Sequence, residues 1–288
     1  MADQQNADVS IPFILPAFSL RGRLVRLQDV STTVVSQHDY PYPLQKVLAE
    51  LLAAGATLSG LLKYDGVFLL QTKTDGPVNL TVVDITHDGH MRGYAQFRPQ
   101  DIKKNDTFQE LLGRGYLAFT VDQGLKIDRY QGIVTLDHET LPSALEHYFD
   151  QSEQLKSRLF IASEKTDEGI WKSSSLLLQE LPEHKVDEDA WVYMESLLKT
   201  LSPQEFLDFS IPYETLLTRL FHEGDVAAFD PIALKAQCRC SEQRIKTFLS
   251  TLTHDEIESL LEKGELKMTC EFCNHDYTFK RQDLLTVH

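Results

Sequence analysis

The segment PLQKVLAELLAAGATLSGLLK (Pro43–Lys63) carries the strongest helical pattern in the chain. Its large apolar residues recur at three- and four-residue steps and form one wide stripe: Leu44, Val47, Leu48, Leu51, Leu52, Leu58, Leu61 and Leu62. A helix with such a stripe buries it against another element, and β-prone segments follow directly in the sequence. We therefore predict a core helix packed on a sheet, not a helix that crosses a membrane or binds a partner.

Strands are predicted on both sides of tight turns in the segments that follow the helix. Asp-Gly dipeptides at Asp65, Asp75 and Asp88 punctuate the β-prone runs 67–73, 77–86 and 91–97. Glycine accepts the positive φ that a hairpin turn requires, so Asp-Gly between such runs is a strong hairpin signal. With two later runs, 116–122 and 132–136, on either side of Gly124, these segments predict a meandering antiparallel sheet.

The remainder of the first part adds a second helix and more strands. The helix is predicted over 143–155, the strand over 157–163, and a second apolar run over 175–181. We expect an α+β fold, with an N-terminal domain at residues 1–182 in which helices pack on an antiparallel sheet.

The pattern changes after Pro182. A polar, acidic stretch leads only into short helical segments, which we place at 189–201, 202–209 and 211–224. Each carries large apolar side chains on one face, and none is long enough to be stable alone in water. We therefore predict a helical linker at residues 183–230 that folds only while it is docked on something else.

The last part, residues 231–288, reads as a small separate domain. Thr253 and Glu256 form a capping box before a helix that ends near Gly264. An earlier helix is predicted over 242–252, and two strands, 265–270 and 275–281, are joined across the sequence CEFCN. All four cysteines of the chain fall in this domain, as Cys238-Arg-Cys240 and Cys270-Glu-Phe-Cys273.

These cysteines predict a zinc site. A CxxC turn between strands aims two thiolates at one point, and CxC places two sulfurs on the same side of an extended backbone. Together, Cys238, Cys240, Cys270 and Cys273 provide four soft ligands, the number and type for one closed tetrahedral Zn²⁺ site per chain.

Three other interpretations explain the four cysteines less well than a zinc site does. Four independent buried thiols do not account for the clustering. A mixed site could use His254 or His275, although four cysteines require no further ligand. An iron–sulfur cluster also takes four cysteines, but CxC followed by CxxC differs from the usual ferredoxin spacings.

A metal in this place has a consequence for folding. The segment has fewer than about sixty residues and few large apolar side chains, so its core is too small to hold without metal. Zinc-bound thiolates are attacked by oxidants, and the two cysteines of each pair are close enough in sequence to form a disulfide. Loss of the metal would remove on the order of 10 kcal/mol of folding free energy. Oxidation could then undock the helical linker and expose apolar surface.

Charge and composition argue against nucleic-acid and membrane partners. The chain has 43 acidic and 28 basic residues, a net charge of −15, which repels a phosphate backbone. The cysteine-containing part, 231–288, has eight basic and nine acidic residues and is nearly neutral. No apolar run reaches the length of about eighteen residues that a membrane helix needs. The N-terminal segment has acids where a signal peptide has Lys or Arg. We expect a cytoplasmic protein.

The sequence offers no catalytic motif. GxxxxGK[ST], HExxH and GxSxG are all absent, and no cysteine lies outside the last 51 residues. We expect a protein that is not an enzyme. A zinc ribbon with a purely structural metal, acting as an interaction or nucleic-acid-binding module, is the alternative.

The sequence resembles the redox-regulated molecular chaperones of the heat-shock protein 33 family. The stretches that carry the resemblance are MRGYAQF, GRGYLAFTVDQG, YQGIVTL, HYFDQSEQL, SLLLQELP, LFHE, CRCSEQRI and CEFCNHDYTF. The family pattern of CxC, about thirty residues and CxxC matches Cys238, Cys240, Cys270 and Cys273 in order. One departure is the run Ser173–Ser175, where family members often carry Gly-Gly.

The resemblance implies an ATP-independent holdase of the oxidative stress response. It implies that the reduced, zinc-bound protein is inactive, and that oxidants form the disulfides Cys238–Cys240 and Cys270–Cys273 and release zinc. It also implies that the C-terminal domain and the linker then unfold. The active form, usually a homodimer, would bind unfolding client proteins. From the residues themselves we predict that clients contact apolar groups of the linker: Trp191, Met194, Leu197, Leu198, Phe206 and Phe209.

Overall fold

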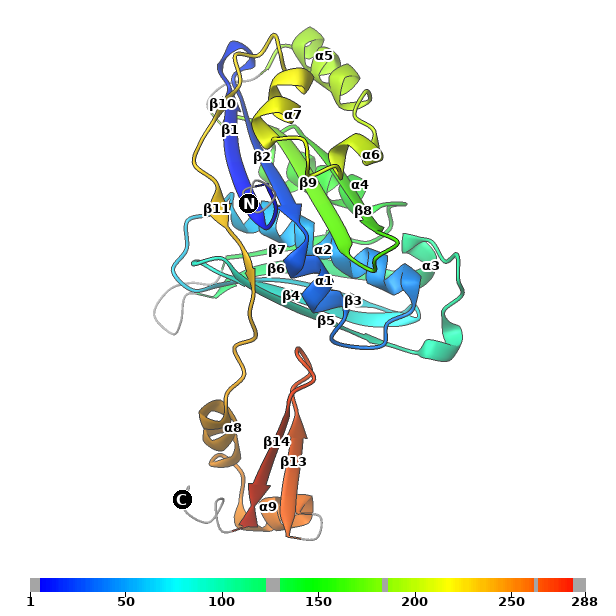
Figure 1. Cartoon of the computed structure of the whole chain (residues 1–288), viewed down its shortest axis with the longest axis vertical. Coiled ribbons are helices and arrows are strands. Elements are labelled where there is room, and N and C mark those ends of the chain that lie inside the picture. Colours follow the sequence, from blue (N-terminus) through cyan, green and yellow to red (C-terminus); the bar gives the residue numbers. More distant parts are fainter. Residues whose placement is uncertain (1–5, 123–129, 183–185, 262–263, 282–288) are drawn as a thin grey trace. The chain divides into compact units, whose positions relative to one another are not determined.

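The computed structural model describes residues 6–122, 130–182, 186–261 and 264–281 (Figure 1). The chain separates into two compact units, Met1–Ala236 and Gln237–His288. The turn at Gly124 and the predicted start of the linker at residue 183 lie outside the described residues. The division into three parts with boundaries at 182 and 230 stays a prediction.

The first unit contains two sheets. One has the strand order β10-β1-β2-β9-β8, with β11 pairing beside β10 on β1. Every pairing in it is antiparallel. Its strands are β1 (Val9–Leu15), β2 (Leu20–Leu27), β8 (Ser157–Lys165), β9 (Trp171–Glu180), β10 (Ala227–Ala228) and β11 (Ile232–Ala233). Neither β1 nor β2 is among the strands predicted from the sequence.

The other sheet has the order β12-β5-β4-β3-β6-β7 and is antiparallel apart from the β12–β5 pair. Its strands are β3 (Val67–Thr74), β4 (Val78–Thr86), β5 (His90–Phe97), β6 (Gly115–Asp122), β7 (Tyr130–Thr135) and β12 (Lys235–Ala236). The predicted antiparallel pairing is therefore confirmed, but the sheet is not a meander throughout, because β6 follows β5 in the chain and yet pairs with β3. Asp75-Gly76 and Asp88-Gly89 form hairpin turns, whereas Asp65-Gly66 connects a helix to β3.

The predicted core helix is α2 (Tyr42–Ser59), and it lies between the two sheets (Figure 1). It is buried on nearly all sides because both sheets pack on it. For this reason its alanines are buried as well as its leucines. It ends at Ser59, with Gly60 as the C-cap, four residues before the predicted end at Lys63. The sequence prediction of a core helix is confirmed, but the helix has a sheet on each side.

Shorter helices and helical turns connect the strands of this unit. They are α1 (Asp29–Val35), α3 (Phe108–Leu112), α4 (Leu141–Tyr148), the 3₁₀ turns η2 (Pro16–Phe18) and η3 (Pro99–Asp101), and the π-helical turn η4 (Phe149–Glu153). The second predicted helix therefore begins at Leu141 and continues through η4, with Thr140 as a capping-box residue.

The opposite face of the first sheet is covered by three short helices, α5 (Glu188–Leu198), α6 (Pro203–Phe206) and α7 (Tyr213–Leu220) (Figure 1). Strand β9 serves both faces, because successive side chains point to opposite sides. Leu177 belongs to the core around α2, whereas Leu176 and Leu178 contact the covering helices. The apolar run in β9 is thus a strand buried on both faces.

The second unit consists of α8 (Glu242–Leu249), α9 (His254–Leu260) and a hairpin of β13 (Glu265–Thr269) and β14 (Asp276–Lys280). The predicted capping box of Thr253 and Glu256 is present at the start of α9. Within the described part of this unit, the buried core has four members, Leu249, Ile257, Leu266 and Phe279. Among the helices in the described ranges of both units, none is long and apolar enough to cross a bilayer.

Candidate functional site

The four cysteines meet in the second unit. Cys238 and Cys240 lie in the extended segment before α8, and Cys270 and Cys273 lie in the turn between β13 and β14. All four Sγ atoms lie within 4.8 Å of one another. The Cys238–Cys270 and Cys240–Cys273 sulfur distances are 3.7 and 3.4 Å. The fold therefore brings together residues that are up to 35 positions apart in sequence.

These distances fit a metal better than a disulfide. Four sulfurs at about 2.3 Å from a tetrahedral zinc lie about 3.8 Å from one another. A disulfide needs about 2.05 Å between sulfurs, and all four cysteines are free thiols here. Each is half-buried, so the cluster is partly shielded from water. The donor set and its spacing suit one tetrahedral Zn²⁺ ion.

The turn between β13 and β14 aims backbone N–H groups at the sulfurs. Phe272 and Cys273 donate N–H bonds to Cys270, and the N–H of His275 bonds Cys273. Asn274 makes this turn possible with a positive φ of 55°, and its N–H bonds the carbonyl of Cys270. Such N–H groups stabilise negative sulfur, as a metal-bound thiolate requires.

The thiols are in an environment that disfavours ionisation without a cation. Burial raises the pKa of Cys270, and the neighbouring Cys238 sulfur adds to this. Burial also raises the pKa of Cys273, and the sulfurs of Cys240, Cys238 and Cys270 act in the same direction. Four thiolates this close together need a compensating positive charge, which a divalent metal supplies.

Tyr277 extends the site beyond the cysteines. Its hydroxyl donates a hydrogen bond to Cys240 Sγ at 3.2 Å, and the His275 ring packs edge-on against its ring at 4.6 Å. The bond to Cys240 raises the pKa of Tyr277 to about 12, so the hydroxyl stays protonated and remains a donor. Tyr277 was not predicted from the sequence as part of the site. The available signal was its position in the predicted strand 275–281, directly after the CxxC turn.

The six predicted client-contact residues lie in the first unit, beneath or within the covering helices. Trp191, Met194, Leu198, Phe206 and Phe209 are buried, and Leu197 is partly buried, in one cluster with the outer face of the first sheet. From the sheet, this cluster takes Val9, Ile11, Phe13, Leu15, Leu20, Leu24, Ala162, Leu176 and Leu178. In this state the apolar groups are therefore a packed core.

Of the serines at the positions where family members often carry Gly-Gly, Ser174 lies at this same interface, whereas Ser173 faces α1 on the other side of the sheet. Ser173, Ser174 and Ser175 are fully buried in β9. The hydroxyl of Ser173 is 2.7 Å from that of Ser31, and the hydroxyl of Ser174 donates to the carbonyl of Phe206 in α6. One of the three therefore ties the sheet to its covering helices.

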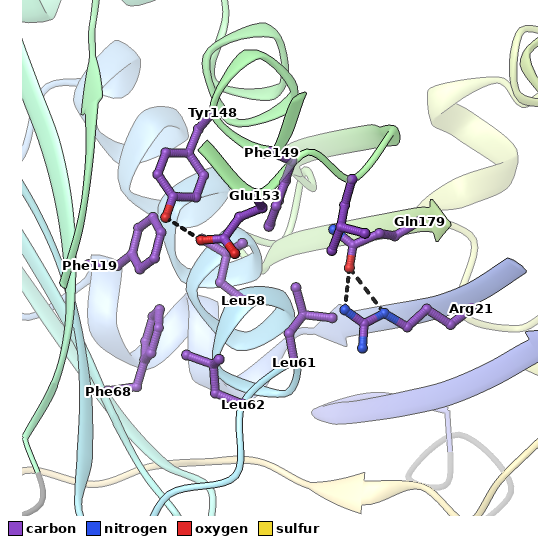
Figure 2. Close-up of a pocket in the computed structure, with 11 residues that line it drawn as sticks. Arg21, Leu58, Leu61, Leu62, Phe68, Phe119, Tyr148, Phe149, Glu153 and Gln179 are labelled. Atoms are coloured by element: carbon purple, nitrogen blue, oxygen red, sulfur yellow. Dashed lines mark hydrogen bonds between the residues drawn. The ribbon is translucent and has the colours of Figure 1, made fainter. Parts of the chain in front are cut away.

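A separate apolar pocket in the first unit, shown in Figure 2, is not a candidate site. It has a volume of about 70 Å³ and is lined mainly by Leu58, Leu61, Leu62, Phe68, Phe119 and Phe149. Its polar groups are already paired: Tyr148 with Glu153 at 2.7 Å, and Arg21 with Gln179 (Figure 2). Nothing in it calls for a ligand.

Comparison with known proteins shows the family to which the chain belongs. The family model described as "Hsp33 protein" matches residues 8–280. A 33 kDa chaperonin of Shigella flexneri serotype 5b is 36% identical over 276 residues, which is 96% of this chain and 94% of the relative. A 33 kDa chaperonin of Escherichia coli (strain K12 / DH10B) is also 36% identical, covering 96% and 93%.

A solved structure agrees in fold. The crystal structure of a 33 kDa chaperonin, a heat shock protein 33 homologue from Thermotoga maritima, superposes with a TM-score of 0.82 at 23% identity and covers 97% of each chain. Together the matches place the chain among molecular chaperones. It belongs to the Hsp33 family.

Proposed function

We propose that this protein is a redox-regulated, ATP-independent holdase that is inactive while reduced and metal-bound. The observation that carries the proposal is the cluster of four sulfur atoms within 4.8 Å, set in a unit where the residues described form a buried core of four side chains. Cys238, Cys240, Cys270 and Cys273 would hold one Zn²⁺ ion. When bound, zinc supplies a cross-link between the two ends of the unit and compensates the charge of the thiolates.

Oxidation of the cysteines is the proposed trigger. Each disulfide, Cys238–Cys240 or Cys270–Cys273, forms as two thiols lose two electrons and two protons. Hypochlorite accepts the electrons and leaves as chloride and water. The sulfurs then no longer bind metal, and the small core is insufficient to keep the unit folded.

The covering helices of the first unit are the proposed source of the client-binding surface. They are short, and their stability comes from packing on the sheet. Undocking would expose Trp191, Met194, Leu197, Leu198, Phe206 and Phe209 together with the apolar sheet face beneath them. A contiguous apolar surface of this kind binds unfolded chains without a defined sequence. We propose that the active form is a homodimer, works in the cytoplasm during oxidative stress, and performs no enzymatic reaction.

The decisive experiment follows metal and chaperone activity in the same sample. Purified reduced protein is treated with hypochlorite while a chromogenic chelator reports zinc release, and a parallel sample reports aggregation of a chemically unfolded client. We expect one zinc per chain to leave as holdase activity appears, and reductant with zinc to reverse both. Zinc that stays bound through oxidation, or leaves with no gain in activity, would show a structural metal only. A gel shift at low salt tests the nucleic-acid-binding alternative, for which we expect no complex.

A further inference from the structure

A second cavity in the first unit has a different character from the apolar pocket of Figure 2. It has a volume of about 290 Å³ and lies between the end of α2, the β4–β5 turn and β11. None of its lining residues is acidic, although the chain has a net charge of −15. Three basic side chains line it instead: Arg23, Lys63 and His87.

The key group is the guanidinium of Arg23, which is buried on β2 between β1 and β9. Its Nη1 donates to Ser10 Oγ at 2.9 Å and its Nη2 donates to the carbonyl of Gly60, both neutral acceptors. Among the described residues no carboxylate pairs with it. Burial, with a smaller effect of the nearby Arg21, lowers the pKa of Arg23 to about 10, which leaves it charged at neutral pH. A buried charge without an opposite charge is costly, and an anion would offset that cost.

The end of α2 is shaped around this guanidinium. A Cβ on Gly60 would lie 2.3 Å from Arg23 Cζ, so a larger residue at this position would displace the guanidinium. Three residues later the exposed Lys63 lines the same cavity and has no ion-pair partner among the described residues. His87, on the other side, is 3.6 Å from the exposed Asp65, which lies outside the lining.

The remaining walls are of two kinds. The Ser10 hydroxyl accepts from Arg23 and keeps its own hydrogen for a ligand, whereas Ser59 donates to the carbonyl of Ala56 and Thr86 donates to Asp88. The apolar walls are Ala56, Leu62, Ile85, Ile232 and Leu234. Two cationic side chains and the Ser10 hydroxyl can together neutralise and hydrogen-bond a phosphate group. The apolar walls match an organic substituent on it. The volume is at the lower end of the range of small-molecule sites, about 300–1,000 Å³.

We propose that this cavity binds a small, soluble organic phosphate, with the phosphate on Arg23 and Lys63 and the organic part against the apolar walls. The site has a consequence for the chain that follows. Ile232 and Leu234 form one wall, and the N–H of Leu234 donates to the carbonyl of Asp8 at 2.8 Å. A bound ligand would therefore hold residues 232–236, which lead into Cys238, against the rest of the first unit.

The test is calorimetric titration of reduced full-length protein in low-salt buffer without phosphate or sulfate. The probes are inorganic phosphate, phenyl phosphate and, as an uncharged match, benzyl alcohol. We expect saturable binding of phenyl phosphate, weaker binding of inorganic phosphate and none of benzyl alcohol. Lys63→Glu should weaken phenyl phosphate binding by about tenfold or more, because an attraction becomes a repulsion. Lys103→Glu, an exposed lysine outside the cavity, is the matched control and should bind as the wild type does.

Two further measurements make the result decisive. Hydrogen exchange of the amides at 232–236 should slow when phenyl phosphate is present, and this slowing should be lost in the Lys63→Glu variant. Phenyl phosphate should raise the Tm of the wild type, and Arg23→Gln should abolish this rise. If Arg23→Gln does not fold, the result for Lys63→Glu decides alone. The proposal is wrong if neither phosphate probe saturates up to about 10 mM. It is equally wrong if Lys63→Glu binds like the wild type, or if benzyl alcohol binds as well as phenyl phosphate does.

Discussion

The guanidinium of Arg26 lies 5.3 Å from the centre of the Phe209 ring, so the covering helices close over a positive charge on β2. Arg26 is fully buried, and its Nη1 donates to the carbonyl of Ile211 at 2.7 Å. Its Nε and Nη2 have no hydrogen-bond partner among the described residues. Burial lowers the pKa of Arg26 to about 10, and it is still charged at neutral pH. Undocking the helices would return this charge to water, which favours the open state.

Replacing this buried charge by an apolar side chain of similar length should therefore strengthen docking. We expect Arg26→Met to raise the free energy of unfolding of the reduced protein by about 1–2 kcal/mol, because the desolvation cost exceeds the combined value of the bond to Ile211, the contact with Phe209 and the attraction of Asp208 and Glu214. Amide exchange in α7 should slow, and activation by hypochlorite should be delayed. The control is Lys172→Met, because the Lys172 ammonium lies 5.4 Å from the same Phe209 ring but is only half-buried. Faster exchange in Arg26→Met than in the wild type would contradict this prediction.

The apolar face of α5 should have two roles, one in each state. Leu198 is buried and Leu197 partly buried in the cluster under the helices. Changing both to Ser should cost about 2–4 kcal/mol of docking free energy in the reduced protein. It should also lower client capture by the oxidised protein, measured as suppression of aggregation, because less apolar surface is available. Val192→Ser, on the exposed side of the same helix, should change neither quantity. Unchanged capture by the double variant would exclude α5 as a client contact.

Metal removal should affect the two units differently. Over the ranges that the structure describes, the second unit has four buried core residues, whereas the first has two large clusters. We expect dialysis of reduced protein against a strong zinc chelator to remove amide protection from β13 and β14 while α2 stays protected. The difference arises because metal binding contributes on the order of 10 kcal/mol to folding of so small a unit. Full protection of the hairpin without metal would mean that its own core is sufficient.

Tyr277 should tune the affinity of the site for metal without being a ligand. Tyr277→Phe removes the hydroxyl that donates to Cys240 Sγ and keeps the ring against His275. Loss of a hydrogen bond to a ligating atom typically weakens metal binding by about 10–100-fold. Competition with a chromogenic chelator measures this, and the mutant should release zinc at lower oxidant concentration. Thr278→Val, exposed on the same strand, should retain the wild-type affinity. Equal affinity in both variants would remove Tyr277 from the site.

The candidate metal centre was predictable because its signal is local. CxC and CxxC each bring two sulfurs together through backbone geometry alone, and no other cysteine in the chain competes for the role. The helix α2 and the hairpins at Asp75-Gly76 and Asp88-Gly89 were predictable for the same reason, since periodicity and turn chemistry act over a few residues.

The first sheet could not be predicted in this way. Strand β2 pairs with β9, so that Leu24 lies opposite Leu176, about 150 positions away in the chain. Pairing over such a distance depends on which surfaces remain to be buried once the local elements have formed. Arg23 and Arg26 interrupt the apolar pattern and therefore obscured β2 in the sequence. Arg23 is buried where the end of α2 packs on it, and Arg26 is buried where the covering helices enclose it.

The sequence by itself determined the α+β class, the core helix, the hairpins β3–β4 and β4–β5 and the four cysteines, because each follows from spacing within a short segment. Tertiary structure alone decided that α2 has a sheet on each side, that Tyr277 donates to Cys240, and that Arg23 borders a cavity without acidic residues. It also decided that the helices after Pro182 cover the outer face of the first sheet. These relationships join residues far apart in sequence, and the free energy that fixes them comes from burial and desolvation, which exist only once the chain has folded.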